Sequence, residues 1–250
     1  MSNRKAPQGL RTGLALSRKV ALVSGGSRGI GLAIARALGI RGCDLVVAAR
    51  DRSALEKAGR ELSRLGRRVL VHTCDVRDPD SVRRLARAVK EQFGRIHILV
   101  NNAGVTQPSL PVEKISYELW KEVLDTNLTG TFLLTQAMLP LMRRGATVVN
   151  NLSIAATQVF PNSSAYCASK HGALGLTNTL REELRSRGIR VMALLPGATD
   201  TGIWKVLWPE APRKKMISAN TVADTVAWAL IVPDQAAVEE LKIGPSAGPL

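Results

Sequence analysis

The sequence predicts an α/β fold built on a doubly wound parallel sheet of about seven strands, with helices on both faces. Short apolar runs alternate along the chain with longer segments of helical periodicity. Of the 250 residues, 45% are hydrophobic but only 4% are aromatic. A core of Val, Leu, Ile and Ala is typical of a sheet covered on both faces. The length suits one domain and leaves too little chain for a second.

The first half of the chain predicts four strands and three helices. Apolar runs at 20–23, 44–49, 69–73 and 96–100 are the strands, since each is short and rich in β-branched residues. Segments 30–39, 52–65 and 79–93 have helical spacing of apolar positions. Asp78 is the expected N-cap of the third helix, and Gly94 its C-terminal stop.

The second half continues the alternation. Residues 116–141 are expected to be helical, as one region or two, and 147–152 to be a fifth strand. A helix over 165–186, stopped by Gly188, precedes a sixth strand at 190–195. A late helix at 221–229 and a short seventh strand at 238–243 complete the pattern. Strands that alternate with helices predict parallel βαβ units, hence the Rossmann type of sheet.

Residues 19–250 are expected to form a single Rossmann-fold domain, after a flexible basic extension at 1–18. The extension has no long apolar stretch and therefore does not resemble a secretory signal; a mitochondrial presequence is the alternative. No segment approaches the roughly 18 apolar residues of a membrane span. The three cysteines, Cys43, Cys74 and Cys167, have no metal-ligand or disulfide spacing, so we expect no metal site and a reducing, cytoplasmic location.

The formal net charge is +15. Such a charge is typical of proteins that bind nucleic acid or an anionic membrane, and that interpretation is one alternative. The basic residues are nevertheless spread over helical segments, as at Arg83, Arg84, Arg87 and Lys90, without interleaved aromatics. We therefore expect an arginine-rich solvated surface and neither nucleic acid nor membrane as a partner.

A glycine-rich loop separates the first predicted strand from the first helix. It reads Ser-Gly-Gly-Ser-Arg-Gly-Ile-Gly over 24–31. Glycines in this position let the backbone turn tightly, approach a pyrophosphate and aim the amides of the helix at the anion. The candidate cofactor-binding residues here are Gly25, Ser27, Arg28, Gly29, Ile30 and Gly31.

This spacing resembles the short-chain dehydrogenase/reductase family, whose motif is Thr-Gly-x-x-x-Gly-x-Gly. Ser24 stands in place of the threonine and keeps the hydroxyl. The resemblance extends in motif order from Lys19 to about Gly202, and is greatest to NADP-dependent 3-oxoacyl-reductase-like members. It implies a Rossmann-fold oxidoreductase that uses a nicotinamide dinucleotide.

The residue after the second strand predicts which dinucleotide. In the family an acidic residue there binds the ribose hydroxyls of NAD. Here Ala49 is followed by Arg50, and Arg28 lies in the glycine loop. Two guanidinium groups suit the 2′-phosphate of NADP(H), which we favour over NAD(H). If the strand were two residues longer, Asp51 would become the NAD-selecting acid.

By resemblance, further residues at the ends of strands contact the cofactor. Asp75 and Val76 would lie near the adenine, and Asn102, Ala103 and Gly104 of the Asn-Asn-Ala-Gly motif, 101–104, would lie at the cofactor after the fourth strand. The Pro-Gly-x-x-x-Thr motif after the sixth strand would place Pro196, Gly197, Thr199 and Thr201 at the nicotinamide carboxamide.

Tyr166 and Lys170 are the central catalytic candidates. They lie four residues apart, on one face of a predicted helix. A nearby ammonium would lower the pKa of the phenol toward neutrality and make a general acid/base. By resemblance, Ser153 would polarise the substrate carbonyl, and Asn127 would hold a water that connects Lys170 to solvent. Lys170 would also hold the nicotinamide ribose.

The prediction is thus hydride transfer between NADP(H) and a carbonyl or secondary alcohol, with Tyr166 as general acid/base. The alternative is a non-catalytic NADP-binding sensor or scaffold on the same fold. By resemblance, residues 201–218 form a substrate lid, in which Trp204 and Trp208 either face a bulky substrate or pack the lid onto the body. The family also implies a homodimer or homotetramer. The substrate itself is not predicted.

Overall fold

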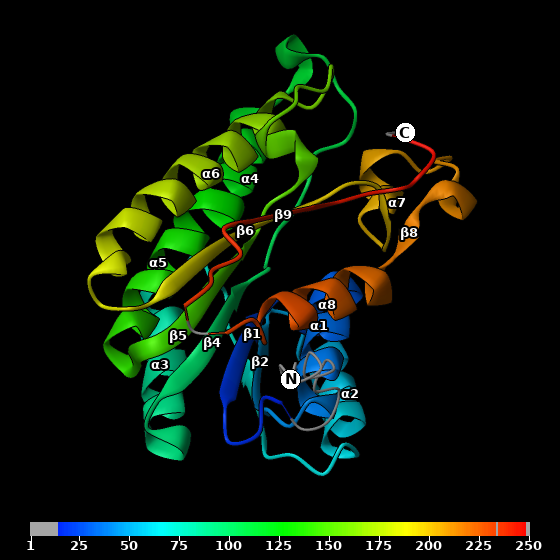
Figure 1. The fold of residues 1–250 in the computed structure, drawn as a ribbon. Helices are drawn as coiled ribbons and strands as arrows, with labels where there is room; N and C mark the ends of the chain where they lie inside the picture. The colour runs from blue at the N-terminus through cyan, green and yellow to red at the C-terminus, as the bar shows by residue number, and fades with distance from the viewer. Residues whose placement is uncertain (1–14, 234, 249–250) are drawn as a thin grey trace, which may run out of the picture.

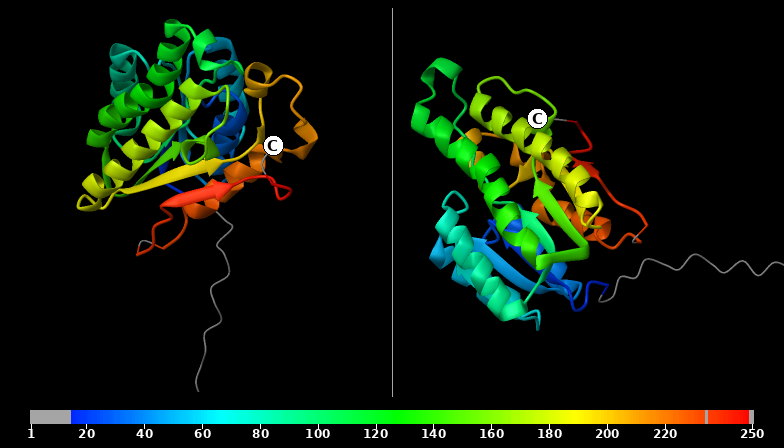
Figure 2. Two further views of the ribbon diagram at one scale, coloured as in Figure 1. Left: turned by 90° about the horizontal axis from the view of Figure 1, so that it is seen from above. Right: turned by 90° about the vertical axis from the view of Figure 1, so that its left-hand side faces the viewer.

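The computed structural model describes residues 15–233 and 235–248 and confirms the α/β class. One sheet of seven parallel strands has the order β3-β2-β1-β4-β5-β6-β9. Its strands are β1 (Val20–Ser24), β2 (Asp44–Ala49), β3 (Val69–Thr73), β4 (Ile96–Asn101), β5 (Met142–Asn151), β6 (Arg190–Pro196) and β9 (Glu240–Ile243). The left view of Figure 2 shows β9, in red, at the edge beside β6.

Helices cover both faces of this sheet, as Figure 1 shows. They are α1 (Gly29–Ile40), α2 (Arg52–Ser63), α3 (Pro79–Phe93), α4 (Tyr117–Leu124), α5 (Gly130–Met138), α6 (Ser164–Arg185), α7 (Trp204–Leu207) and α8 (Ala219–Ala229). The layer of α3 to α6 lies on one side, and the layer of α1, α2 and α8 on the other. The expected N-cap of α3 is present, because the Asp78 carboxylate accepts from the backbone N–H of Asp80.

Alternate residues of each central strand enter the two halves of the core. In β1, Ala21 and Val23 pack toward α1 and α8, whereas Val20 and Leu22 pack toward α3 and α5. All of them are buried. The period of two explains why these strands are apolar throughout, and burial on both faces fixes the sheet that positions the loops at its carboxyl edge.

The region 116–141 is helical in two main parts, joined by a wider turn. A π-type segment, Asp125–Thr129, lies between α4 and α5, and the Gly130 N–H bonds the Asp125 carbonyl, five residues back. The next strand, β5, begins five residues earlier than expected, at Met142. π-Turns within helices are frequent at functional sites, and this one carries Asn127.

The predicted boundaries change at the two ends of the chain. Leu16 is buried, and its N–H bonds the Arg41 carbonyl, so the packed domain begins before Lys19. The rest of the predicted extension, 1–14, lies outside the described residues. In the region 199–218, α7 and a two-stranded parallel sheet, β7 (Thr199–Asp200) with β8 (Ile217–Ser218), were not predicted. No helix in the described ranges is long and apolar enough to cross a membrane.

Candidate active site

A cleft of about 1620 Å³ runs along the carboxyl ends of the strands. It brings together almost every predicted site residue: Gly25, Ser27, Arg28, Gly29, Ile30, Arg50, Asp75, Val76, Asn102, Ala103, Gly104, Ser153, Tyr166, Lys170, Pro196, Gly197, Thr199 and Thr201. Of the predicted site residues, only Gly31 and Asn127 do not line the cleft. Ligands of open α/β sheets bind at this edge, so the topology alone makes the cleft the candidate site.

The glycine loop is held in place by the loop after β4. Gly25 and Gly29 have positive φ values of 63° and 56°, which glycine tolerates best. The Asn102 side chain donates to the carbonyls of Ser24 and Gly25, at 2.9 and 3.2 Å. The Ser24 hydroxyl accepts from the N–H groups of Asn102 and Ala103. The serine that replaces the family's threonine thus ties the two loops together.

Position 31 requires glycine because there is no room for a side chain. A Cβ on Gly31 would lie 2.3 Å from Asn102 Nδ2 and 2.4 Å from the Gly25 carbonyl oxygen. Because that oxygen is backbone, the glycine loop itself must move. We expect Gly31→Ala to weaken NADPH binding at least about tenfold and to cost about 1–3 kcal/mol of unfolding free energy, as overpacking does. Fluorescence titration and chemical denaturation measure the two effects.

Gly175 supplies the matched control. It lies exposed within α6, and a Cβ there meets nothing within 4 Å. Gly175→Ala should leave NADPH binding unchanged and stabilise the protein by up to about 1 kcal/mol, from helix propensity. Equal behaviour of the two variants would contradict the steric role of Gly31.

The structure decides between Arg50 and Asp51 at the end of β2. The strand ends at Ala49, and Asp51 is the N-cap of α2, where its carboxylate accepts from the Ala54 N–H at 3.0 Å. Arg50 is therefore the residue that follows the strand into the cleft. The strand is not two residues longer, so the condition for an NAD-selecting Asp51 is not met, although Asp51 lines the cleft and uses only one carboxylate oxygen in the cap.

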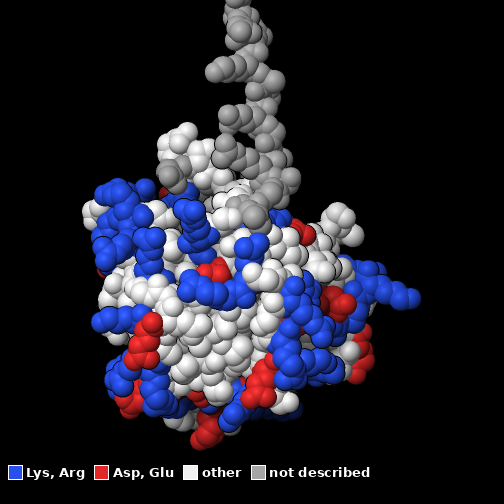
Figure 3. All heavy atoms as spheres, turned by 90° about the horizontal axis from the view of Figure 1, so that it is seen from below, with Lys and Arg blue, Asp and Glu red and all other residues white. Residues whose placement is uncertain are grey.

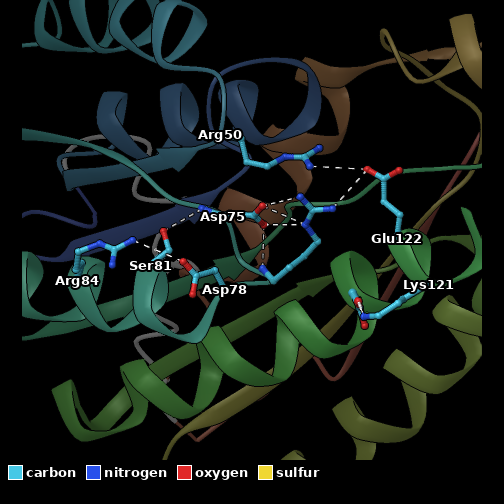
Figure 4. A network of polar contacts seen from close by, with 9 residues as sticks. Arg50, Asp75, Asp78, Ser81, Arg84, Lys121 and Glu122 are labelled. Carbon is cyan, nitrogen blue, oxygen red and sulfur yellow. Dashed lines mark hydrogen bonds and ion pairs between the residues drawn. The ribbon is translucent and has the colours of Figure 1, made fainter. Parts of the chain in front are cut away.

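A network of charged side chains surrounds Arg50 (Figure 4). Arg77 donates to both carboxylate oxygens of Asp75, and this pairing keeps the pKa of Asp75 below its usual value. Glu122 of α4 lies 3.8 Å from Arg50 and 3.7 Å from Arg77. Sequence reasoning missed Arg77 and Glu122, because the contact joins elements far apart in the chain.

Tyr166 and Lys170 share one face of α6, as predicted, with Lys170 Nζ 5.6 Å from the centre of the phenol ring. Lys170 is only 6% exposed, and its ammonium donates to the Asn151 carbonyl at 3.1 Å. Burial lowers the pKa of Lys170 to about 8. The site therefore holds a buried amine that is still mostly protonated at neutral pH.

The expected lowering of the Tyr166 pKa by Lys170 is wrong for this structure. Burial raises the pKa of the phenol, and a hydrogen bond with Ser153 opposes it without reversing it. Desolvation is the dominant cause, because a charged phenolate would lose its water in the cleft. A phenol that keeps its proton at neutral pH is suited to donate one.

Asn127 lies in the π-turn, and its side chain makes three hydrogen bonds. Its Oδ1 accepts from the Val105 N–H at 2.9 Å, while Nδ2 donates to the Val105 carbonyl and to Ser169 Oγ, both at 2.9 Å. The amide thereby fixes the loop after β4 against the helix that carries Lys170. Its role in holding a water remains a prediction.

Two residues that sequence reasoning missed position the catalytic helix. Gln107, fully buried, accepts from the Tyr166 N–H at 3.1 Å and donates to the Asn162 carbonyl at 3.1 Å. Asn151 donates to Asn102 Oδ1 at 2.8 Å and offers its carbonyl to Lys170. The pair Asn150-Asn151 at the end of an apolar strand could have indicated a role for Asn151. Gln107 stands alone in a loop and belongs to no motif.

The loop after β6 closes the cleft on its other side. A Cβ on Gly29 would lie 3.4 Å from Thr201, so this loop reaches the glycine loop. Trp204 donates its indole N–H to the Thr199 carbonyl at 2.8 Å, which anchors the region to the body. Trp208 is 43% exposed and lines the cleft. Trp204 also lines the cleft, so both tryptophans are placed where a substrate could meet them.

The residues of the cleft fit a nicotinamide dinucleotide. Arg28 and Arg50 lie at one end of the cleft, and the backbone amides of the glycine loop lie in the middle. The buried ammonium of Lys170, bonded to the Asn151 carbonyl, lies at the other end. In the described part of the chain, no cluster of His, Cys, Asp and Glu has the arrangement of a metal site.

Comparisons with known proteins agree with this geometry. Residues 19–212 match the family model described as short chain dehydrogenase. A putative ketoacyl reductase of Streptomyces coelicolor is 37% identical, over 88% of this chain and 92% of its own. D-threitol dehydrogenase of Mycolicibacterium smegmatis is 40% identical, over 86% and 85%.

Solved structures give the same result. An alcohol dehydrogenase from Thermococcus sibiricus, complexed with 5-hydroxy-NADP, superposes with a TM-score of 0.86 at 32% identity, covering 92% of this chain and 97% of the other. An actinorhodin polyketide ketoreductase variant with NADPH superposes with a TM-score of 0.80 at 34% identity, covering 92% and 96%.

Proposed function

The chain belongs to the short chain dehydrogenase family, and from that premise we propose which of its residues carry the reaction. It is an NADP(H)-dependent oxidoreductase that moves a hydride between nicotinamide and a carbonyl/alcohol pair. The observation that supports our residue assignment is the placement of Tyr166, Lys170 and Ser153 on one wall of the cleft.

In the reducing direction, NADPH supplies the hydride when bound. Ser153 and Tyr166 hold the substrate oxygen between their hydroxyls and polarise the carbonyl. Tyr166 donates its phenolic proton to that oxygen as the negative charge develops, as a general acid. Lys170 binds the nicotinamide ribose and stabilises the phenolate that remains. Asn127 holds the loop after β4 against α6. Through a bound water it would return a proton from solvent to Tyr166 by way of Lys170.

Arg28 and Arg50 are proposed to hold the 2′-phosphate. Arg28 is exposed at the N-terminal end of α1, and Arg50 is half-exposed, with Glu122 as its only carboxylate neighbour within 4 Å in the described chain. Guanidinium groups bind phosphate bidentately. Asp75 and Val76 would contact the adenine, and Thr199 and Thr201 the carboxamide.

Arg50→Ser tests the selection of NADP(H). The loss of one charge-assisted contact should weaken NADPH binding about tenfold or more and leave NADH binding unchanged. Fluorescence titration with both nucleotides measures this. Arg52→Ser, two residues on and paired with Glu56, is the control and should alter neither. Parallel losses for NADPH and NADH would refute the assignment.

The substrate is proposed to be a ketone next to a bulky apolar group, with a 3-oxoacyl thioester as the first candidate. Relatives that include ketoacyl reductases support this, as do Phe160, Leu119 and Trp208 in the cleft wall. NADPH oxidation against a library of 3-oxoacyl thioesters, cyclic ketones and sugars is the decisive screen. Turnover of none of them would favour a sensor over an enzyme.

Three further expectations are proposed. Residues 201–218 act as the lid over the substrate. The chain forms a homodimer or homotetramer, since Trp120 and Phe132 are exposed on α4 and α5; light scattering would measure the mass. A reducing, cytoplasmic location is supported by Cys43, Cys74 and Cys167, all buried free thiols.

A further inference from the structure

A second cavity lies at the opposite end of the sheet from the cleft. It has a volume of about 360 Å³ and lies at the amino-terminal ends of β5 and β6. Four arginines line it: Arg144, Arg181, Arg185 and Arg190. Figure 3 shows Lys and Arg spread around the face seen from below, with fewer Asp and Glu among them. The strands that separate the two cavities are about 20 Å long, so this cavity is no part of the catalytic cleft.

The Arg181 guanidinium is fixed by neutral acceptors. It donates to the Val191 carbonyl at 3.2 Å, to Asn178 Oδ1 at 2.9 Å and to the Glu239 carbonyl at 2.8 Å. These contacts set its orientation without neutralising its charge. A side chain held in this way loses little entropy when a ligand binds.

Arg190 is also held by neutral acceptors, whereas Arg144 is placed by its contact with Gly188. Arg190 donates to Thr147 Oγ1 and to the Ala236 carbonyl, both at 3.3 Å. Arg144 lies over Gly188, where a Cβ would come within 2.7 Å of its guanidinium nitrogen. Gly188 has a φ of 65°, so glycine serves both the turn and this close approach.

One acidic residue, Glu239, lines the cavity together with the four arginines. Among the described residues, no ion pair within 4.0 Å involves Arg144, Arg181 or Arg190. Arg185 pairs with Glu182 and lies 3.6 Å from Glu239. Several positive charges therefore share one cavity, and their mutual repulsion would be relieved by an anion.

We propose that this cavity binds a small molecule with two linked phosphate groups. A tetrahedral phosphate accepts from guanidinium groups that approach from different elements, and linked phosphates match three charges better than a single carboxylate does. The volume lies within the range of small-molecule sites. The ligand would join the start of β5 to the end of α6, the helix that carries Tyr166 and Lys170 at its other end, and would stabilise the fold.

Inorganic pyrophosphate is the probe. Titration calorimetry on NADPH-saturated protein keeps the glycine loop occupied, so that only the second cavity is free to bind. We expect saturation below millimolar pyrophosphate and a rise in melting temperature that sodium chloride of equal ionic strength does not reproduce. Arg144→Gln and Arg181→Gln should each weaken binding at least about tenfold. Arg144 is exposed, so its replacement tests the site without disturbing the fold.

Arg187→Gln is the matched control. Arg187 lies one residue before Gly188, but it bonds the Leu139 carbonyl and does not line the cavity. This variant should bind pyrophosphate as the unmodified protein does. The proposal is overturned if sodium chloride gives the same stabilisation, if Arg187→Gln weakens binding as much as Arg144→Gln, or if no heat is measured at millimolar pyrophosphate.

Discussion

Tyr166→Phe is expected to remove about three orders of magnitude or more from kcat while leaving the Kd for NADPH unchanged. The substitution deletes only the phenolic oxygen. The Tyr166 N–H still bonds Gln107, and α6 still packs in place. Because the proton has no other donor of suitable position, the developing alkoxide would have to take it from water. Stopped-flow hydride transfer and fluorescence titration separate the two quantities.

The sequence offers a natural control for that variant. The only other tyrosine, Tyr117, begins α4 and is 71% exposed. Tyr117→Phe should behave as the unmodified protein in both measurements. Retained turnover in Tyr166→Phe would mean that the proton comes from another group. A loss of NADPH binding equal to the loss of kcat would mean that the phenol acts on the cofactor rather than on the substrate.

Lys170→Met is expected to damage turnover and NADPH binding together, yet to make the coenzyme-free protein more stable. Loss of a charged hydrogen-bond donor to the ribose should weaken NADPH binding about tenfold or more. Burial lowers the Lys170 pKa from 10.5 to about 8, which corresponds to about 3 kcal/mol of destabilisation at neutral pH. Allowing for the lost hydrogen bond to Asn151, the variant should gain about 2 kcal/mol.

The stability advantage of Lys170→Met is expected to depend on pH in a defined direction. Below pH 8 both the folded and the unfolded protein carry the proton, so the penalty is constant. Between about pH 8 and 10.5 the unfolded chain binds the proton that the folded chain has released, and the stability of the unmodified protein rises. The advantage of Lys170→Met should therefore shrink across that window. Urea denaturation at pH 7 and pH 10 measures it.

Lys57→Met is the control for this pair of measurements. Lys57 is exposed on α2, and its replacement should change neither stability with pH nor NADPH binding. A Lys170→Met protein that is less stable at pH 7 would show that the amine's contacts outweigh its burial.

The fold was largely predictable because every central strand is buried on both faces. An apolar run such as Val20–Val23 has no other satisfactory place in a chain of this length, and its alternation with helices leaves few topologies. The π-turn at Asp125–Thr129 was not predictable, because its width follows from packing between α4, α6 and the loop after β4. The pair β7 and β8 is too short to leave a periodic pattern.

The site was predictable where its residues fall in local motifs. The glycine loop, Tyr166 and Lys170 are local in sequence. Contacts such as Glu122 with Arg77 join distant elements and left no signal. The sign of the Tyr166 pKa shift was missed because spacing reveals a neighbouring amine but says nothing of the water that folding removes.

The chain of hydrogen bonds from the glycine loop through Asn102 and Asn151 to Lys170 bears on redesign. A protein engineer who transplants a different nucleotide loop into this scaffold also replaces the first partner in that chain. Unless both asparagines are matched to the new loop, the graft would misplace the amine at its far end. Coenzyme exchange and proton handling in this scaffold should therefore be optimised as one unit.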